Sequence, residues 1–124
     1  MTGSEATVVV LGASPKPERY AYRAQQLLRE HGYLAVPVNP AFDEVAGERC
    51  YASIREVPRP IDTITLYLGE ARSTPLVDEM IAANPRRIIV NPGAENDTLA
   101  AKAAAAGIEV VEDCTLVMLR AGTF

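Results

Sequence analysis

Val8-Val9-Val10-Leu11-Gly12-Ala13-Ser14 is the stretch of sequence that decides the fold. Four consecutive apolar residues, three of them β-branched, are typical of a strand that is buried on both faces, as the strands of parallel sheets are. Gly12 ends the apolar run and begins a short polar connection. The stretch therefore predicts a buried parallel strand followed by a loop.

Strand and helix patterns alternate on the carboxyl side of this stretch. Apolar residues recur at helical spacing from Tyr20 to His31, and Gly32 follows them where helices commonly end. Further strands are predicted at residues 34–38, 61–68, 87–90 and 108–111, and further helices at 75–83, 95–106 and, capped by Asp113, up to Arg120. This alternation predicts an α/β fold with one doubly wound parallel sheet of about five strands and helices on both faces.

Two parts of the chain have a weaker pattern. Pro37 has no N–H to donate, so we expect it where no neighbouring strand needs that donor. The connection 41–60 contains Gly47, Pro58 and Pro60, which interrupt regular structure. This pattern predicts an irregular path with a short helical turn at residues 53–56. No repeat or low-complexity linker divides the chain, so residues 1–124 are expected to form one domain.

The composition excludes several classes of protein. With 124 residues, of which 48% are hydrophobic and 23% charged, the chain is neither disordered nor fibrous in type. Its net charge of −4 argues against nucleic-acid binding. No membrane span or signal peptide is recognisable, so a cytoplasmic protein with no membrane contact is expected. Two cysteines and one histidine predict neither a disulfide framework nor a metal site.

Small, polar or proline residues follow the predicted strands at their carboxyl ends. In doubly wound sheets, ligands bind beyond these ends. The residues that lie there are Gly12, Ala13, Ser14 and Lys16 after the first strand, Asn39 and Pro40 after the second, Gly69 after the third, and Asn91, Pro92 and Gly93 after the fourth. Any loop favours such residue types, but their joint placement predicts a binding site at this edge.

The first of these loops has features of a phosphate-binding loop. Gly12 allows a close approach of the backbone to a ligand, and the amide groups at the start of the following helix favour an anion. Lys16, Arg19 and Arg23 crowd that helix start, where positive charge is unfavourable without an anionic partner. A solvated face partly balanced by Glu18 is the alternative interpretation.

An ordinary dinucleotide site is disfavoured. The fingerprint G-x-G-x-x-G needs three glycines, and only Gly12 is present at the corresponding positions. An acidic residue normally follows the second strand to hold the ribose hydroxyls. Here Asn39 and Pro40 stand in its place, and the first acid is Asp43.

At these residues the chain resembles the coenzyme A-binding domain family, a Rossmann-like module found alone in bacteria and as the N-terminal part of succinyl-CoA synthetase alpha subunits. The resemblance covers nearly the whole chain. It rests on Val10-Leu11-Gly12-Ala13-Ser14, Pro17-Glu18-Arg19, Tyr22-Arg23, Gly32-Tyr33, Val36-Pro37-Val38-Asn39-Pro40, Gly47, Tyr51-Ala52-Ser53-Ile54, Pro60-Ile61-Asp62, Asn91-Pro92-Gly93-Ala94-Glu95-Asn96 and Ala106-Gly107-Ile108.

The resemblance implies a place for each part of coenzyme A. The implied contacts are Gly12, Ala13 and Ser14 for the pyrophosphate, Asn39 and Pro40 for the adenosine, and Leu68 and Gly69 toward Asn91, Pro92 and Gly93 for the pantetheine arm. Val38, which precedes Asn39, is also predicted to line the site. A basic residue often follows the second proline in the family, but here it is Ala41, which leaves Lys16, Arg19 or Arg23 for the 3′-phosphate. The resemblance does not extend to the ligase domain of synthetase subunits, so it implies no ligase activity.

The sequence therefore predicts a non-catalytic module that binds coenzyme A or a short acyl-CoA. No G-x-S-x-G elbow and no paired nucleophile and base are visible, so no catalytic residue is predicted. Two alternatives remain open: a nucleotide-binding regulator of the NAD(P) type, and a thiol-exchange protein in which Cys114 reacts with the CoA thiol. The acyl group also stays open, as does the choice between a homodimer and a complex with another protein.

Overall fold

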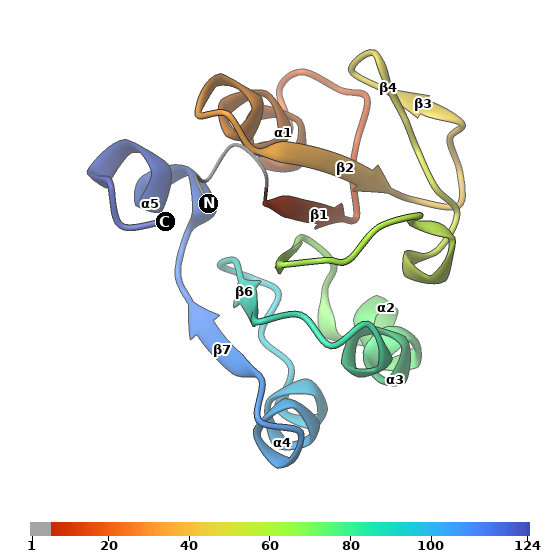
Figure 1. The fold of residues 1–124 in the computed structure, drawn as a ribbon, viewed down its shortest axis with the longest axis vertical. Coiled ribbons are helices and arrows are strands. Elements are labelled where there is room, and N and C mark those ends of the chain that lie inside the picture. The colour runs from red at the N-terminus through yellow and green to blue at the C-terminus, as the bar shows by residue number, and fades with distance from the viewer. Residues whose placement is uncertain (1–5) are drawn as a thin grey trace.

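The computed structural model describes residues 6–124, in which strands and helices alternate (Figure 1). The strands are β1 (Thr7–Leu11), β2 (Leu34–Val38), β3 (Glu44–Val45), β4 (Glu48–Arg49), β5 (Thr63–Leu66), β6 (Arg87–Val90) and β7 (Glu109–Glu112). The helices are α1 (Tyr20–Glu30), α2 (Glu70–Ser73), α3 (Val77–Ala82), α4 (Asp97–Ala105) and α5 (Thr115–Ala121), with short 3-10 turns η2 (Ile54–Glu56) and η3 (Thr74–Leu76).

Five of the strands form one parallel sheet in the order β2-β1-β5-β6-β7. The predicted α/β fold with a doubly wound parallel sheet is thereby confirmed. The chain runs outward from β1 to β2 and then returns past β1 to β5, so the winding direction reverses between β1 and β5. In folds of this class, the crevice beyond the carboxyl ends at such a reversal is the usual place for a ligand.

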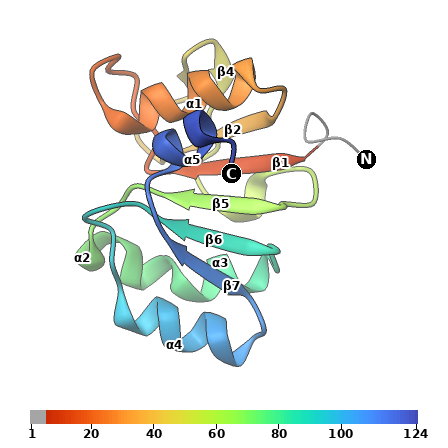
Figure 2. The same cartoon turned by 90° about the vertical axis from the view of Figure 1, so that its left-hand side faces the viewer.

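Helices cover both faces of the sheet (Figure 2). On one face, Val10 of β1 belongs to a buried cluster with Leu28 of α1 and Leu119 of α5. On the other face, the neighbouring Val9 belongs to a cluster with Leu99 of α4. Because successive side chains of a strand point to opposite faces, the apolar run of β1 fills both cores.

The long connection between β2 and β5 contains a hairpin, β3–β4, where the sequence pattern predicts an irregular path. Its turn residues Ala46 and Gly47 have φ values of 53° and 82°. Left-handed conformations at both central residues let a two-residue turn join antiparallel strands. Gln25 Nε2 donates to the Val45 carbonyl (3.0 Å) and Arg29 Nη1 to the Ala46 carbonyl (3.1 Å), which fastens the hairpin to α1. The helical turn predicted near residue 54 is present as η2.

Three predicted helix boundaries differ from the structure for local reasons, and the strand predicted at residues 61–68 is shorter than predicted, as β5. The 75–83 helix is preceded by α2 and η3, and Pro75, which lacks an N–H, lies where α2 gives way to η3 and then α3. The 95–106 helix begins at Asp97, because the Asn96 side chain accepts a hydrogen bond from the Leu99 N–H (3.1 Å) and caps it. The N-cap of α5 is Cys114 rather than Asp113.

Pro37 lies on β2, which is an edge strand. Its carbonyl accepts a hydrogen bond from the Tyr51 N–H (3.1 Å), and the Tyr51 carbonyl accepts one from the Asn39 N–H (2.9 Å). The chain around Tyr51 thus covers the carboxyl half of this edge, and the missing donor of Pro37 faces no strand that needs it. Among residues 6–124, no helix is long and apolar enough to cross a membrane.

Candidate functional site

A hollow opens at the carboxyl ends of β1, β2, β5 and β6. It consists of two cavities of about 380 and 320 Å³, volumes typical of small-molecule sites. Gly12, Asn39, Leu68 and Arg72 line both cavities, so the two adjoin. We call the two cavities together the cleft. It lies where the reversal of the winding direction leads us to expect a ligand.

Most of the predicted site residues line the cleft. The first cavity is lined by Gly12, Ala13, Ser14, Lys16, Arg19, Asn39, Leu68, Gly69, Pro92 and Gly93, and the second adds Val38 and Pro40. Arg23 and Asn91 line neither cavity. Loops that are far apart in the sequence therefore meet at one place, as the positions after the predicted strands suggest.

Gly12 makes a turn that another residue would strain. Its φ is +91°, a conformation that residues with a Cβ rarely adopt. A Cβ built at this position would lie 2.9 Å from Leu68 Cδ2 and 3.1 Å from the Tyr67 carbonyl oxygen. The N–H groups of Gly12 and Ala13 both donate to the Val38 carbonyl, at 3.1 and 3.3 Å. The glycine is thus needed for the loop conformation and for its contact with the end of β5.

The Asn39 side chain joins the loops that follow β1 and β2. Its Nδ2 donates to the Ala13 carbonyl (2.8 Å), and its Oδ1 accepts from the Ala41 N–H (2.9 Å). The amide thus holds the wall of the cleft in shape, whereas the family resemblance implies a ligand contact there. A carboxylate at this position could not donate to the Ala13 carbonyl.

The electrostatics of the cleft favour an anion. Helix α1 begins at the cleft with Arg19 as its N-cap, has no side-chain cap and has no acidic residue in its first turn. Its first N–H groups are therefore left with a partial positive charge. Lys16, Arg19 and Arg72 also line the cleft, and none of the three forms an ion pair within residues 6–124.

The two predicted site residues outside the cleft have other contacts. The Arg23 guanidinium lies over the Tyr20 ring, 5.8 Å from its centroid. Asn91 is buried, and its Nδ2 donates to Thr65 Oγ1 (2.8 Å) and to the Leu66 carbonyl (2.9 Å). Its Oδ1 accepts from the Thr115 N–H (2.9 Å). Asn91 therefore connects the end of β6 to β5 and to the start of α5.

Several residues that line the cleft were not among the predicted ones, and those with large aromatic or charged side chains in the first cavity are Tyr20, Phe42, Tyr67 and Arg72. Tyr20 and Phe42 are 66% and 37% exposed, which is unusual for large aromatic side chains, and exposed rings beside a cavity offer flat surfaces for stacking. Phe42 follows the Asn39-Pro40 pair closely, and this proximity is the signal that could have identified it. Arg72 has no such signal, because it lies in a four-residue helix without a periodic pattern.

Neither cysteine lines the cleft. Burial raises the pKa of the Cys50 thiol, whose Sγ lies 3.5 Å from the Asn39 carbonyl oxygen as a hydrogen-bond donor. Cys114 is the N-cap of α5. Burial also raises the pKa of Tyr67 to about 12, and its hydroxyl lies beside Thr65 and Thr115 without a well-formed hydrogen bond of its own. These three groups are thus poorly placed or poorly ionised for nucleophilic chemistry in the cleft.

Comparisons with known proteins agree with this architecture. The crystal structure of an uncharacterized protein superposes with a TM-score of 0.90 at 39% identity, covering 96% of this chain and 98% of that one. The uncharacterized protein YneT of Bacillus subtilis is 27% identical over 74 residues, which are 60% of this chain and 55% of YneT. The crystal structure thus shares the fold over nearly the whole chain, and YneT is similar in sequence over 60% of it.

A third relative bears the name of an enzyme subunit. The alpha subunit of acetate–CoA ligase (ADP-forming) II from Pyrococcus furiosus is 36% identical over 56 residues, 44% of this chain and only 12% of that subunit. The chain therefore spans little more than half of YneT and a small part of the ligase subunit. A family model described as "CoA binding domain" matches residues 6–120. Because that match covers nearly the whole chain, this protein belongs to the CoA binding domain family.

Proposed function

We propose that this protein binds coenzyme A or a short acyl-CoA in the cleft, and that its role is binding rather than catalysis. The observation that carries the proposal is the meeting of the Gly12 loop, the uncapped start of α1 and three cations without ion pairs in one hollow. That combination suits a ligand with several phosphates. Membership of the CoA binding domain family supports the choice of ligand.

The two cavities differ in the chemistry that they offer the ligand. The first holds the Gly12 loop with Lys16 and Arg19, which suits the phosphates. The second is lined mainly by apolar side chains beside Val38 and Pro40, which suits the adenosine. Arg72 lines both cavities, so in this arrangement it faces a phosphate where the ligand passes from one to the other. The pantetheine arm then follows Leu68 and Gly69 toward Pro92 and Gly93.

The side chains of the cleft support binding without chemistry. Among the described residues, Glu79 is the only carboxylate that lines it, and Glu79 Oε1 already accepts a hydrogen bond from the Ile54 N–H (2.7 Å). No histidine or cysteine of the described chain lines either cavity. Histidine, carboxylates and cysteine are among the most common general bases and nucleophiles of enzymes, so the lack of a free one among the described residues of the cleft favours binding over chemistry.

Thermal unfolding with added ligands tests the choice of ligand. A ligand at ~100 times its dissociation constant stabilises the folded state by ~2.7 kcal/mol, a shift of several degrees in Tm for a domain of this size. We expect that shift with millimolar CoA or acetyl-CoA, a smaller one with dephospho-CoA, and little with NAD or NADP. A Tm that rises with NAD but does not change with CoA would contradict the proposal and favour a nucleotide-binding regulator.

A matched pair of variants tests the place of the ligand. Arg19→Gln and Arg23→Gln each remove one positive charge near the start of α1, but only Arg19 lines the cleft. We expect Arg19→Gln to weaken CoA binding about tenfold, because a charge-assisted hydrogen bond to phosphate contributes roughly 1.5 kcal/mol, and Arg23→Gln to weaken it far less. Equal effects of the two variants in calorimetric titrations would mean that only the overall charge matters and that the cleft is misplaced.

A further inference from the structure

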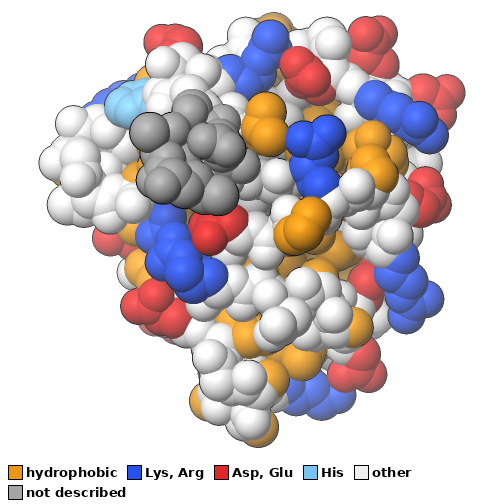
Figure 3. All heavy atoms as spheres, viewed as in Figure 1, with side chains coloured by type: hydrophobic (Ala, Val, Ile, Leu, Met, Phe, Trp, Pro, Cys, Tyr) orange, Lys and Arg blue, Asp and Glu red, His pale blue; other side chains and the backbone are white. Residues whose placement is uncertain are grey.

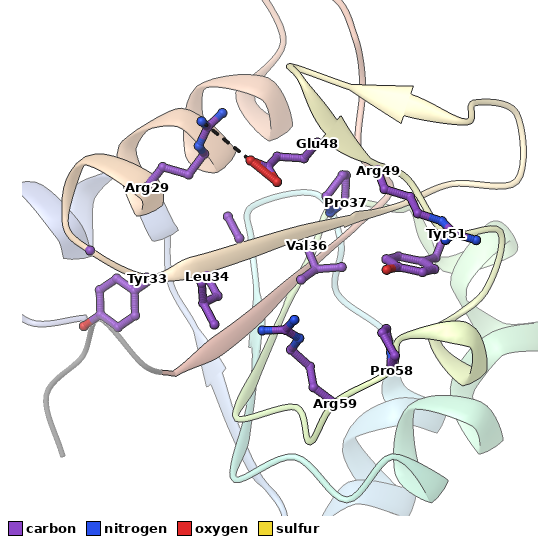
Figure 4. A pocket seen from close by; sticks show the side chains of 12 residues that line it. Arg29, Tyr33, Leu34, Val36, Pro37, Glu48, Arg49, Tyr51, Pro58 and Arg59 are labelled. Carbon is purple, nitrogen blue, oxygen red and sulfur yellow. Dashed lines mark ion pairs between the residues drawn. The ribbon is translucent and has the colours of Figure 1, made fainter.

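A second concave surface lies along the edge strand β2 (Figure 4). It has a volume of about 330 Å³, and its walls come from the end of α1, from β2, from β4 and from the chain at Pro58 and Arg59. Within residues 6–124, no residue lines both this hollow and the cleft. We call it the edge groove. Figure 3 shows basic side chains among hydrophobic ones over β2.

The edge groove gathers positive charge in an acidic protein. Among the described residues, three of the chain's 12 Lys and Arg residues line it, namely Arg29, Arg49 and Arg59, against one acid, Glu48. The chain as a whole has a net charge of −4, so the groove is positively charged in a protein that is negatively charged overall. Guanidinium groups gathered around one hollow repel each other unless an anion lies between them.

The contacts within the protein compensate this charge only in part. Arg29 Nη2 lies 3.6 Å from Glu48 Oε2, and both side chains are more than 40% exposed, so solvent weakens the pair. The Arg49 guanidinium lies over the Tyr51 ring, 4.9 Å from the centroid, which leaves its N–H groups free at the rim. Arg59 forms no ion pair within residues 6–124. Figure 4 shows Arg59 reaching toward β2 from the side opposite Arg29.

The backbone at the floor of the groove favours a small ligand over a peptide strand. The hydrogen bonds of Pro37 and Asn39 with Tyr51 show that alternate residues of β2 point outward, so the N–H of Ala35 also faces this edge. Pro37 supplies no N–H, and Tyr51 occupies the positions beyond it. A peptide strand added to this edge could accept a hydrogen bond from the Ala35 N–H, but Pro37 and Tyr51 would prevent the next hydrogen bonds. A compact oxyanion needs only one N–H beside the guanidinium groups.

We propose that the edge groove binds a small multivalent oxyanion, carrying either phosphate groups or two carboxylates. Arg49 and Arg59 supply paired N–H donors, whose planar geometry matches both kinds of anion, and the Ala35 N–H adds a donor at the floor. Arg29 adds charge from the third wall while it shares Glu48. This site is independent of the coenzyme A proposal, because it shares no residue with the cleft.

Nuclear magnetic resonance on the full chain tests the site with two probes, inorganic pyrophosphate and succinate, each against sodium chloride at equal ionic strength. The signals to follow are the Ala35 amide and the arginine Nε–H groups. We expect saturable shifts with at least one probe and not with chloride, and the stronger probe identifies the anion class. In R49Q/R59Q, which changes two exposed side chains, we expect binding at Ala35 to weaken at least about tenfold.

The double variant K16Q/R19Q is the matched control, since it removes the same charge from the cleft. We expect it to leave the Ala35 shifts unchanged while it reduces any shifts of Gly12 and Ala13. Shifts at Ala35 that grow linearly without saturation, that chloride reproduces, or that persist in R49Q/R59Q would overturn the proposal. Shifts confined to Gly12 and Ala13 would also overturn it and leave the cleft as the only anion site observed.

Discussion

Along β5 and β6, the two faces of the sheet are built from alternating residues of the same strands, yet one face is apolar and the other is mainly polar. The residues of β5 and β6 on the side of α3 and α4 are all apolar, namely Ile64, Leu66, Ile88 and Val90. On the side of α1 and α5, the same strands and the residue that follows β6 present Thr63, Thr65, Arg87 and Asn91, with Ile89 among them. Both sets are buried.

The difference separates the interactions that stabilise the core from those that fix where neighbouring segments of the chain lie. Apolar contacts on the first face stabilise without directional preference. On the second face each polar group needs a partner, so the hydrogen bonds specify where neighbouring segments lie. Thr65 Oγ1 and Thr115 Oγ1 are 2.8 Å apart, and with Asn91 they fix the start of α5. Arg87 Nε donates to Thr63 Oγ1 (3.1 Å) at the opposite end.

The largest effect is expected from Ile64→Ala on the apolar face. Ile64 is fully buried in the centre of the sheet, so the variant loses transfer free energy and leaves a cavity. We expect the free energy of unfolding to fall by about 2–5 kcal/mol in urea titrations, with little change in the denaturant slope. A loss below about 1 kcal/mol would show that this face is not the main source of stability.

On the polar face, Asn91→Ala is expected to cost about 1–3 kcal/mol, because Thr65 and the Thr115 N–H lose a buried partner. Hydrogen exchange measures the position-setting role directly. The Thr115 amide should exchange faster, while the Leu99 amide, which Asn96 caps, serves as an internal control. Unchanged exchange at Thr115 would mean that packing alone holds α5.

A smaller, pH-dependent effect is expected at Asp62, at the amino end of the polar face. Burial would raise the pKa of Asp62, but hydrogen bonds from Arg86 and Thr63 hold it below the ordinary value of 3.8. A lowered folded-state pKa contributes stability above the unfolded-state value, and this contribution disappears as the pH falls through the folded-state value. Asp62→Asn should therefore cost about 1 kcal/mol or less at pH 7, since solvent screens the pair, and almost nothing near pH 2. A cost that stays constant between pH 7 and pH 2 would exclude the ionic contribution.

The smallest effect is expected from Tyr67→Phe. The Tyr67 hydroxyl is buried without a well-formed hydrogen bond, so its removal leaves no partner unsatisfied. The stability should change by less than about 1 kcal/mol in either direction, as measured by the shift in Tm. Thr65→Val is the comparison, because Thr65 has bonded partners and should lose more. A large loss in the phenylalanine variant would reveal a bond that the hydroxyl makes in solution.

Local sequence patterns predicted the sheet well, because a strand that is buried on both faces consists of consecutive apolar residues, such as Val8-Val9-Val10. The loops of the cleft were also predictable, since the carboxyl ends of parallel strands meet at one edge. Asn91 could not be assigned correctly to an internal role, because its partners Thr65 and Thr115 lie 26 and 24 residues away. The two-residue strands β3 and β4 are too short for a periodic pattern.

The two edge strands of the sheet, β2 and β7, also affect whether copies of the molecule associate at high concentration. Exposed borders of sheets recruit other chains and lead to aggregation unless something interrupts them. On β2 the interruption is Pro37, and on β7 it is the exposed carboxylates of Glu109 and Glu112. Each border therefore carries its own barrier to fibre growth, one through a missing donor and the other through like-charge repulsion.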